Sequence, residues 1–190
     1  ITFNGQLIHM IEAASPDNID YTAFGIDDAI IIDNTGAFRD KEALSLHLKS
    51  KGASKVILTA PGKGIPNIVY GVNNKTIDIE KENIFSAASC TTNAIVPVLD
   101  VIENSLGIEN GHIETIHSYT NDQNLLDNYH KKYRRGRSAA LNMVITETGA
   151  AKAVVKAIPN LKDKLTASAV RVPTPNVSLA ILKLSVKKET

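Results

Sequence analysis

Cys90 is the one cysteine of the 190-residue sequence, and hydroxyl residues flank it, with Ser89 before it and Thr91 after it. Extended residues 84–89 lead into it, and apolar residues then recur at helical spacing over 91–106. A thiol at a helix N-terminus faces unpaired backbone N–H groups and the positive end of the helix dipole, which both favour the thiolate. A lone cysteine is otherwise usually a small buried apolar residue. The flanking hydroxyls and the predicted helix start favour a reactive nucleophile.

A thiolate nucleophile usually works with a base, and the sequence offers five histidines. His47 fits the exposed side of a predicted helix, and His9 has no other catalytic signal near it. His112 and His117 share a predicted strand but are an odd number of residues apart, so they point to opposite faces. His117 leads into a polar loop at the strand end, where sites are often built. We therefore favour His117 as the base, with His130 as the alternative.

Two segments and one arginine could bind anions. Thr148 and Gly149 precede a predicted helix over 150–158, and such a helix start binds phosphate or is simply a cap. The basic run 131–137 is typical of a solvated surface or a weak polyanion patch. Arg171 lies between two valines at a strand end, where an arginine needs an anionic partner, and phosphate offers the bidentate geometry that it prefers.

Other common site motifs are absent from the sequence. No His-Glu-x-x-His or paired-cysteine pattern exists, so we predict no metal site. The glycines at 62 and 64 precede a predicted strand and not a helix, so they do not form a dinucleotide fingerprint. No Walker-type phosphate loop is present either.

The first half of the chain reads as alternating strand and helix. Residues 29–33 and 55–60 form apolar runs, and the first run has the pattern of a strand buried on both faces. Between them Asp40 can cap a helix over 41–51, which predicts a parallel βαβ unit with a right-handed crossover. A further strand is predicted over 67–72.

The second half changes in style near residue 89. A strand over 112–120, the helix over 150–158, and strands over 166–171 and 177–186 predict an antiparallel or mixed sheet. We therefore expect two domains, residues 1–89 and 90–190, and the fold class α/β followed by α+β.

Composition sets broad limits. The sequence is 43% hydrophobic and 22% charged with a net charge of +1, which is typical of soluble globular proteins and argues against bulk binding to nucleic acid or membrane surfaces. Its apolar runs are far shorter than the roughly 20 residues of a membrane helix. A single cysteine excludes an internal disulfide and suits the cytoplasm. The start at Ile1 leads us to expect a chain cut from a longer one.

Together these residues resemble the phosphorylating glyceraldehyde-3-phosphate dehydrogenase family. The motifs that carry the resemblance, in the family's order and spacing, are residues 88–93, 117–123, 134–137, 148–154 and 171–178. The resemblance implies that Cys90 attacks an aldehyde and that His117 activates the thiol while hydride passes to NAD, with NADP as the alternative. The thioester so formed reacts with inorganic phosphate.

The resemblance also implies the remaining site residues. The substrate's own phosphate is expected at Thr120, Asp122, Arg135 and Arg171. The attacking phosphate is expected at Ser89, Thr91, Thr148, Gly149 and Arg171. The cofactor is expected at Thr35, Gly36 and Thr59, at the ends of the two parallel strands. The implied partners are a phosphorylated aldehyde and phosphate, in a cytoplasmic, glycolytic homotetramer.

The resemblance covers the middle of the family's chain. Residues 1–89 are similar to the later part of its Rossmann-type dinucleotide domain and 90–190 to the earlier part of its catalytic domain. Because the family's glycine fingerprint is missing, we expect little NAD-dependent activity from these residues alone. Three alternatives stay open: an erythrose-4-phosphate dehydrogenase, a non-catalytic fragment that binds polyanions or RNA through 131–137, and a thiol hydrolase that uses Cys90 and His117 without a nicotinamide.

Overall fold

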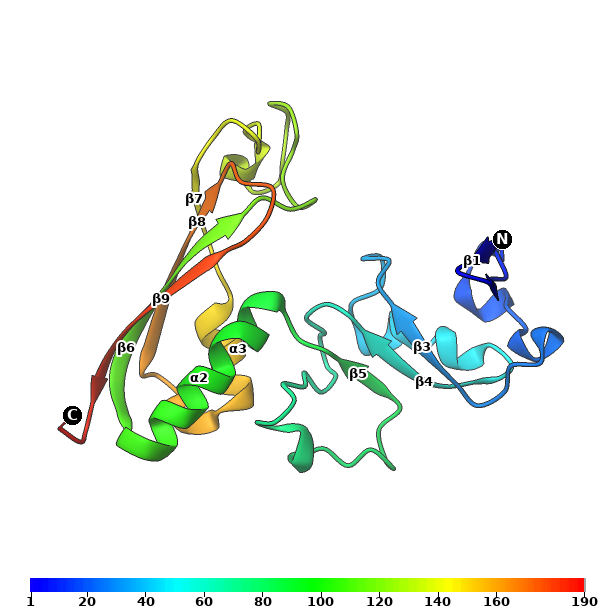
Figure 1. Ribbon diagram of the computed structural model, residues 1–190, viewed down its shortest axis with the longest axis horizontal. Helices are drawn as coiled ribbons and strands as arrows, with labels where there is room; N and C mark the ends of the chain where they lie inside the picture. The colour runs from blue at the N-terminus through cyan, green and yellow to red at the C-terminus, as the bar shows by residue number, and fades with distance from the viewer. Residues whose placement is uncertain (190) are drawn as a thin grey trace. The chain divides into compact units, whose positions relative to one another are not determined.

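A computed structural model of the chain describes residues 1–189 of its 190 residues. The chain divides into two compact units: residues 1–70 with 74–89, and residues 71–73 with the chain from Cys90 onward. The first unit contains a three-stranded parallel sheet and the second a four-stranded mixed sheet (Figure 1). Both units therefore combine helices and strands, as the sequence predicts.

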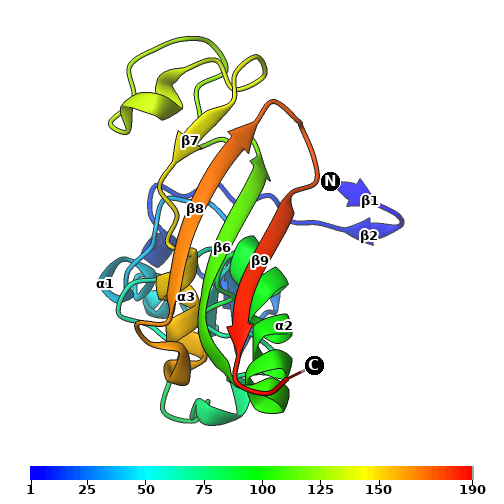
Figure 2. The same ribbon diagram turned by 90° about the vertical axis from the view of Figure 1, so that its left-hand side faces the viewer.

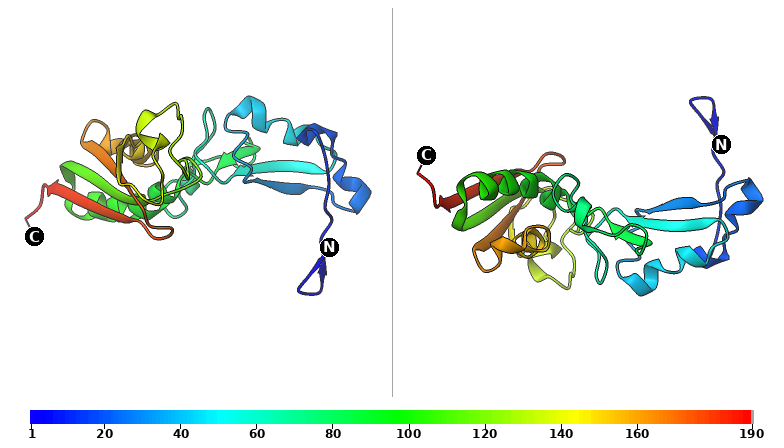
Figure 3. Two further views of the ribbon diagram at one scale, coloured as in Figure 1. Left: turned by 90° about the horizontal axis from the view of Figure 1, so that it is seen from above. Right: turned by 90° about the horizontal axis from the view of Figure 1, so that it is seen from below.

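The sheet of the first unit has the order β3-β4-β5 and is parallel throughout. Its strands are β3 (Ala29–Asp33), β4 (Ala53–Leu58) and β5 (Ile84–Ser86), and both views of Figure 3 show β3 beside β4. The predicted parallel βαβ unit is thus confirmed. The prediction that residues 29–33 are buried on both faces is wrong for this chain. Ile30 and Ile32 are 56% and 54% exposed, because the packed core of the unit covers the opposite face of the strand.

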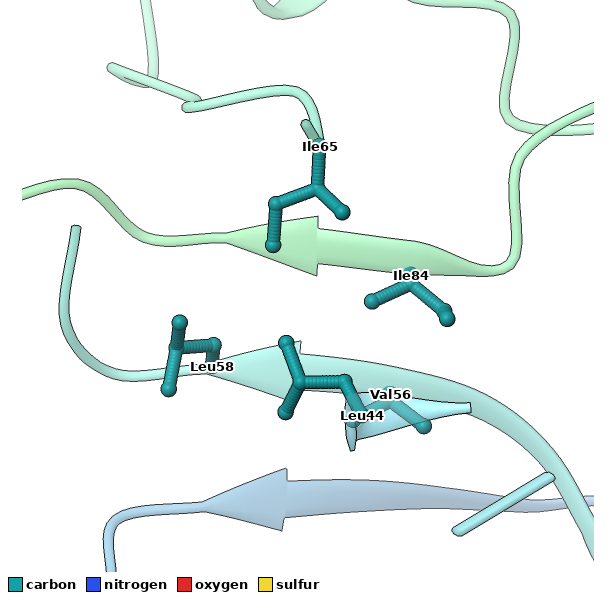
Figure 4. Packing of buried hydrophobic residues seen from close by; sticks show 5 residues of the cluster. All are labelled: Leu44, Val56, Leu58, Ile65 and Ile84. Carbon is teal, nitrogen blue, oxygen red and sulfur yellow. The ribbon is translucent and has the colours of Figure 1, made fainter. Parts of the chain in front are cut away.

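The core of the first unit lies on one side of this sheet. Figure 4 shows its side chains gathered over β4 and β5: Leu44, Val56, Leu58, Ile65 and Ile84. Leu44, Val56 and Leu58 have no exposed surface. Fully burying such a side chain stabilises the fold by about 1.5–3 kcal/mol, so this cluster holds β4 and β5 in register.

The helix between β3 and β4 is shorter than the sequence predicts. α1 (Lys41–Leu44) ends after one turn, and a 3₁₀ helix, His47–Lys49, follows it. Asp40 caps α1 as expected, because its carboxylate accepts a backbone N–H of the first turn at 2.9 Å. The Ser45 hydroxyl donates to a carbonyl of the preceding turn at 2.6 Å, and such local hydrogen bonds compete with a continuous helix.

The predicted strand over 67–72 is also wrong. Asn67 forms an isolated bridge with Ser86, and no strand continues from it. The Asn67 side chain instead hydrogen-bonds the backbone of Gly62 in both directions at 3.1 Å and donates to the carbonyl of Ile65 at 3.0 Å. These local contacts shape a loop, and Pro66 cannot donate to a ladder.

The second unit has the sheet order β7-β8-β6-β9, in which β6 and β8 are parallel and the other neighbours are antiparallel. Its elements are α2 (Cys90–Leu106), β6 (Ile108–Ser118), β7 (Val144–Thr146), α3 (Ala150–Ala157), β8 (Leu165–Val172) and β9 (Leu179–Val186). Figure 2 shows α2 and α3 together behind the sheet, on one of its faces. The mixed sheet is confirmed, and the short strand β7 is an addition to the prediction.

The remaining elements are short. They are the hairpin β1 (Thr2–Phe3) and β2 (Gln6–Leu7), and the 3₁₀ helices Pro16–Asn18, Tyr21–Phe24, Asn74–Thr76, Tyr133–Gly136 and Pro159–Leu161.

α2 and β6 run in opposite directions, and this brings the start of α2 close to the end of β6. Gly107 adopts φ +71°, and its N–H closes the helix by donating to the carbonyls of residues 102 and 103, after which β6 returns. Pro97 lies inside α2 without ending it. Seventeen helical residues span about 25 Å and eleven strand residues about 36 Å, so β6 is long enough to return to the start of α2.

His47 is buried, which corrects its predicted exposure. It is 7% exposed, and its Nε2 lies 2.9 Å from Oδ2 of Asp33, which is 1% exposed. The break after α1 turns His47 away from the exposed side of a regular helix and toward the end of β3. The rings of Phe38 and His47 pack edge to face, with their centroids 5.5 Å apart.

Replacing Asp33 by asparagine is expected to destabilise the protein at neutral pH and to matter less in acid. Burial alone would raise the pKa of Asp33, but hydrogen bonds from His47 and Thr35 outweigh it and hold the pKa below its usual value. A carboxyl with a depressed folded pKa stabilises the fold above its unfolded pKa and loses this contribution as pH falls through the folded value. Urea unfolding should show the gap between wild type and variant narrowing below about pH 4. A gap that stays constant down to acid pH would contradict this.

Candidate active site

Cys90 and His117 meet at the start of α2 and the end of β6. Cys90 Sγ lies 3.6 Å from His117 Nε2 and 3.9 Å from the Thr91 hydroxyl. The thiol is exposed, and Cys90 is the first residue of the helix. The structure thus places a nucleophile, a base and a hydroxyl at a helix N-terminus, where backbone N–H groups and the helix dipole favour negative charge.

The period of β6 decides which histidine reaches the thiol. Thr115 and His117 are two residues apart and share the face of the sheet that is covered by the helices, where Thr115 is buried. His112 points the other way and lies 2.7 Å and 3.0 Å from the hydroxyls of Thr166 and Ser168. His130 hydrogen-bonds the backbone of its own loop. The structure therefore brings His117 to Cys90.

The tautomer of His117 follows from its second nitrogen. Nδ1 lies 2.6 Å from the carbonyl oxygen of Ser118. A carbonyl only accepts, so Nδ1 carries the proton and donates it, and in the neutral ring the lone pair of Nε2 faces Cys90 Sγ. In this state His117 can accept the thiol proton, and the Ser118 carbonyl fixes the ring's orientation.

Arg171 connects the Ser118 carbonyl, which orients this histidine, to a hydroxyl. Its Nη1 donates to the Ser118 carbonyl at 3.0 Å and to the Thr120 hydroxyl at 3.2 Å, and it lies 3.2 Å from His117 Nδ1. Burial lowers the pKa of Arg171, the nearby charge of Arg135 lowers it further, and Cys90 raises it. Arginine stays protonated nonetheless, so a half-buried positive charge stands beside the catalytic pair.

Arg135 lies in the segment before β7 and is 8% exposed. Its Nη1 forms an ion pair with the Asp122 carboxylate, its Nε donates to the Thr146 hydroxyl at 2.9 Å, and its Nη2 donates to the Glu147 carbonyl at 3.2 Å. Burial lowers the pKa of Arg135, against the charge of Glu147. Asp122 therefore holds Arg135 in place, and the mutual repulsion of Arg135 and Arg171 would be relieved by a bound anion.

A cavity of about 440 Å³ opens at the thiol. It is lined by residues of the first turn of α2, by the end of β6 with Thr120, and by residues 176–180. In the last segment the Ser178 hydroxyl accepts the Ser118 N–H at 3.1 Å, and Val177 adopts φ +68°. A β-branched residue at positive φ is strained. Residues 176–178 lie in a motif that carries the family resemblance and 177–180 in a predicted strand, but no site residue is predicted among 176–180.

The second predicted phosphate segment lies at the start of α3. Gly149 is the N-cap of this helix, and the Thr148 hydroxyl accepts the Ala150 N–H at 3.2 Å. Thr148 lines a different hollow, of about 570 Å³, together with Lys152. Ser89 is half-buried and ends the first unit, directly before Cys90. Thr148 is not among the residues that line the Cys90 cavity, although both belong to the second unit.

Two of the three predicted cofactor residues, Thr35 and Thr59, meet at Asp33, the last residue of β3. Asp33 Oδ1 accepts the N–H and the hydroxyl of Thr35, both at 2.9 Å. The Asp33 carbonyl accepts the N–H of Thr59 at 2.9 Å and its hydroxyl at 3.2 Å. Gly36 follows at φ +75°, in the left-handed region that favours glycine. All three lie at the carboxyl ends of parallel strands, where open α/β sheets bind ligands.

The basic run 131–137 is partly neutralised within the fold. Arg135 pairs with Asp122, and Arg137 Nε lies 3.1 Å from Asp127 Oδ1. These ion pairs weigh against a polyanion surface.

Over residues 1–189, no three histidine, cysteine, aspartate or glutamate side chains are grouped so that they could hold a metal. Within the same residues, every helix is too short or too polar to cross a membrane.

Comparison with known proteins gives consistent matches. Residues 89–190 match the family model described as "Glyceraldehyde 3-phosphate dehydrogenase, C-terminal domain". A "Glyceraldehyde-3-phosphate dehydrogenase-like protein" of Pseudomonas aeruginosa (strain UCBPP-PA14) is 60% identical over 100% of this chain and 41% of its own length. "Glyceraldehyde-3-phosphate dehydrogenase A, chloroplastic" of Zea mays is 48% identical over 100% of this chain and 46% of its own length. "Glyceraldehyde-3-phosphate dehydrogenase 2" of Nostoc sp. (strain PCC 7120 / SAG 25.82 / UTEX 2576) is 47% identical over 100% of this chain and 56% of its own length. The chain thus spans about half the length of the curated relatives that it matches.

Proposed function

The chain belongs to the glyceraldehyde-3-phosphate dehydrogenase family, and from this membership we propose that its protein oxidises glyceraldehyde 3-phosphate to 1,3-bisphosphoglycerate with a nicotinamide cofactor. The observation that carries the proposal is the 3.6 Å approach of His117 Nε2 to Cys90 Sγ, with Nδ1 turned to the Ser118 carbonyl. A thiolate and a base in this arrangement are suited to covalent acyl chemistry.

The first step is formation of a bond between Cys90 and the aldehyde. His117 accepts the thiol proton through Nε2, Sγ attacks the carbonyl carbon, and the protonated His117 returns the proton to the carbonyl oxygen to give a thiohemiacetal. Backbone N–H groups at the start of α2 stabilise the thiolate before attack.

The second step converts the thiohemiacetal to a thioester. His117 takes the proton of the hemiacetal hydroxyl as the carbon is oxidised. The chemistry supplied by a bound nicotinamide dinucleotide is acceptance of the hydride from that carbon, which leaves a thioester on Cys90. The residues that would hold this cofactor are Thr35, Gly36 and Thr59. The attachment of the two threonines to Asp33, at the carboxyl ends of β3 and β4, fits such a ligand.

The third step is attack of inorganic phosphate on the thioester. A phosphate oxygen adds to the acyl carbon, and the C–S bond breaks, which releases the acyl phosphate and returns the thiolate of Cys90. We propose that Ser89, Thr91, Thr148 and Gly149 bind this phosphate, through hydroxyls and the N-terminus of α3. Arg171 and Thr120 bind the substrate's own phosphate. Arg135 adds positive charge, and Asp122 acts by holding Arg135.

The rest of the proposal concerns the whole protein. Residues 1–89 are the later part of a Rossmann-type dinucleotide domain, and residues 90–190 are the earlier part of the catalytic domain. NAD is the proposed cofactor, with NADP as the alternative, in a cytoplasmic, glycolytic homotetramer. The single cysteine suits that compartment, although the Zea mays relative is chloroplastic by name.

An absorbance assay tests this function. The protein that carries this chain should reduce NAD or NADP with glyceraldehyde 3-phosphate only when inorganic phosphate is present. Arsenate should replace phosphate, because it has the same charge and shape. Cofactor reduction at the same rate without phosphate would sink the proposal. Ester hydrolysis at Cys90 with no reduction of a nicotinamide would favour the thiol-hydrolase alternative.

The erythrose-4-phosphate alternative is tested by comparing kcat/KM on the two aldehydes. We expect the triose to be preferred, because the loop 119–122 and residues 148–152 are more similar to the triose enzymes, and the relatives named above carry that name. A clear preference for erythrose 4-phosphate would contradict this choice.

Replacing Arg171 by lysine is expected to raise KM for glyceraldehyde 3-phosphate by about tenfold or more. Lysine keeps the charge but loses the planar fork that bridges the Ser118 carbonyl, the Thr120 hydroxyl and a phosphate. Unphosphorylated glyceraldehyde is the control substrate, and its KM should change far less. An equal rise in KM for both aldehydes would mean that Arg171 acts by orienting His117 and not by binding the substrate phosphate.

A further inference from the structure

The contact between Asp33 and His47 is absent from the mechanism above, although it is the most deeply buried contact between two titratable side chains of the first unit. The Asp33 side chain has no exposed surface and that of His47 is 9% exposed. Burying two ionisable groups is costly unless further hydrogen bonds satisfy them, and replacement by apolar residues is often neutral for stability. Stability alone is therefore a weak explanation for this pair.

Every polar group of Asp33 except its own N–H points to the predicted cofactor edge or to His47. Oδ1 accepts hydrogen bonds from the N–H and hydroxyl of Thr35, and the carbonyl accepts them from the N–H and hydroxyl of Thr59. Oδ2 faces His47. Asp33 thereby fixes two strand-end loops at once. The Thr35 hydroxyl also accepts the N–H of Ala37 at 3.2 Å, which extends the constraint through Gly36.

His47 orients the carboxylate of Asp33 from behind. A carboxylate can rotate about its Cβ–Cγ bond, and each rotation moves the oxygen that holds Thr35. The 2.9 Å contact to His47 Nε2 fixes one oxygen, and so it fixes the other. The ring is itself held by the edge of Phe38, while its Nδ1 is buried without a hydrogen-bond partner among the described residues. A buried unsatisfied nitrogen is a cost that a purely structural residue, such as leucine, would avoid.

We propose that Asp33 and His47 are positioning residues for the dinucleotide: they hold the turn of Thr35 and Gly36 and the end of β4 at Thr59 in the shape that binds it. This proposal rests on the proposed function for the identity of the ligand. The pair does not touch the reacting atoms, and it acts through Thr35 and Thr59.

The test is dinucleotide affinity, measured by calorimetry on the whole protein for the better bound of NAD and NADP. His47→Leu is expected to weaken binding about tenfold, since it frees the carboxylate that orders the turn. His47→Gln is expected to stay within about threefold of wild type, because its amide can donate to Asp33 in place of Nε2. Leu44→Ala is the control: it destabilises the same unit from its core without touching Asp33. It should keep wild-type affinity.

A second variant keeps the test valid if His47→Leu folds poorly. Thr35→Val removes the hydroxyl that Asp33 accepts, from an exposed position, and should weaken binding about as much. The double variant should lose little more affinity than the single variant that binds the dinucleotide less tightly, because both changes break one chain of contacts. Additive losses, affinity unchanged in His47→Leu, or an equal loss in Leu44→Ala would overturn the proposal.

Turnover separates this inference from the proposed function. A protein that binds a dinucleotide in a manner dependent on His47 but oxidises no aldehyde would retain the inference and refute the function. A protein that oxidises the aldehyde normally, and whose dinucleotide affinity does not depend on His47, would retain the function and refute the inference.

Discussion

Replacing Cys90 by serine is expected to lower kcat/KM for phosphate-dependent aldehyde oxidation by about 10⁴-fold or more. A serine hydroxyl is a far weaker nucleophile at neutral pH than a thiol that stands at a helix N-terminus, 3.6 Å from a histidine nitrogen. Serine occupies almost the same volume at this exposed position, so the fold should not change. The measurement is initial-rate absorbance of the reduced cofactor over a range of aldehyde concentrations.

Dinucleotide binding is the control for this variant. Because Cys90 belongs to the second unit and the predicted cofactor residues to the first, Cys90→Ser should leave cofactor affinity within about twofold of wild type. Residual turnover within about a hundredfold of wild type would refute Cys90 as the nucleophile.

Replacing His117 by asparagine is expected to lower kcat by about 10²–10⁴-fold. The asparagine amide can take the place of Nδ1 and keep the donation to the Ser118 carbonyl, but it has no atom at the position of Nε2. The variant therefore removes the base with little change to the fold. Rates of Cys90 alkylation by iodoacetamide should fall as well, because the base no longer draws the proton from the thiol.

His112→Asn is the matched control, since it makes the same change on the same strand but on the opposite face. Its ring contacts Thr166 and Ser168, so activity should stay near wild type. Equal losses of activity in the two variants would mean that any histidine-to-asparagine change in β6 disturbs the site, and that the loss in His117→Asn does not identify a base. A small effect of His117→Asn would refute the assignment of the base.

Much of the fold follows from local signals in the sequence. Asp40 caps α1, Gly107 ends α2 with a positive φ, and the apolar run 29–33 forms the predicted strand, because each depends on residues close in sequence. The errors arise where a short-range signal competes with another contact. The helix expected over 41–51 breaks when its Ser45 hydroxyl bonds the preceding turn. The strand expected over 67–72 is lost to the side-chain contacts of Asn67.

The candidate site divides in the same way. Cys90 and His117 could be selected from the helix start and from the period of β6, which are local properties. The Ser118 carbonyl and the Ser178 hydroxyl could not, because their contacts are made by backbone atoms or join segments 60 residues apart. The helical pattern over 41–51 predicts that His47 is exposed, and this is wrong because its partner Asp33 lies on another element, 14 residues earlier. Periodicity contains no information about such pairs.

The most direct test of the account is the mass of the enzyme during a single turnover. The whole protein, mixed with glyceraldehyde 3-phosphate and oxidised cofactor but without phosphate, should gain one 3-phosphoglyceroyl group, and peptide mapping should locate it on Cys90. Inorganic phosphate should then remove the group and release an acyl phosphate. Reduced cofactor formed without any adduct, or an adduct on another residue, would contradict a thioester at Cys90.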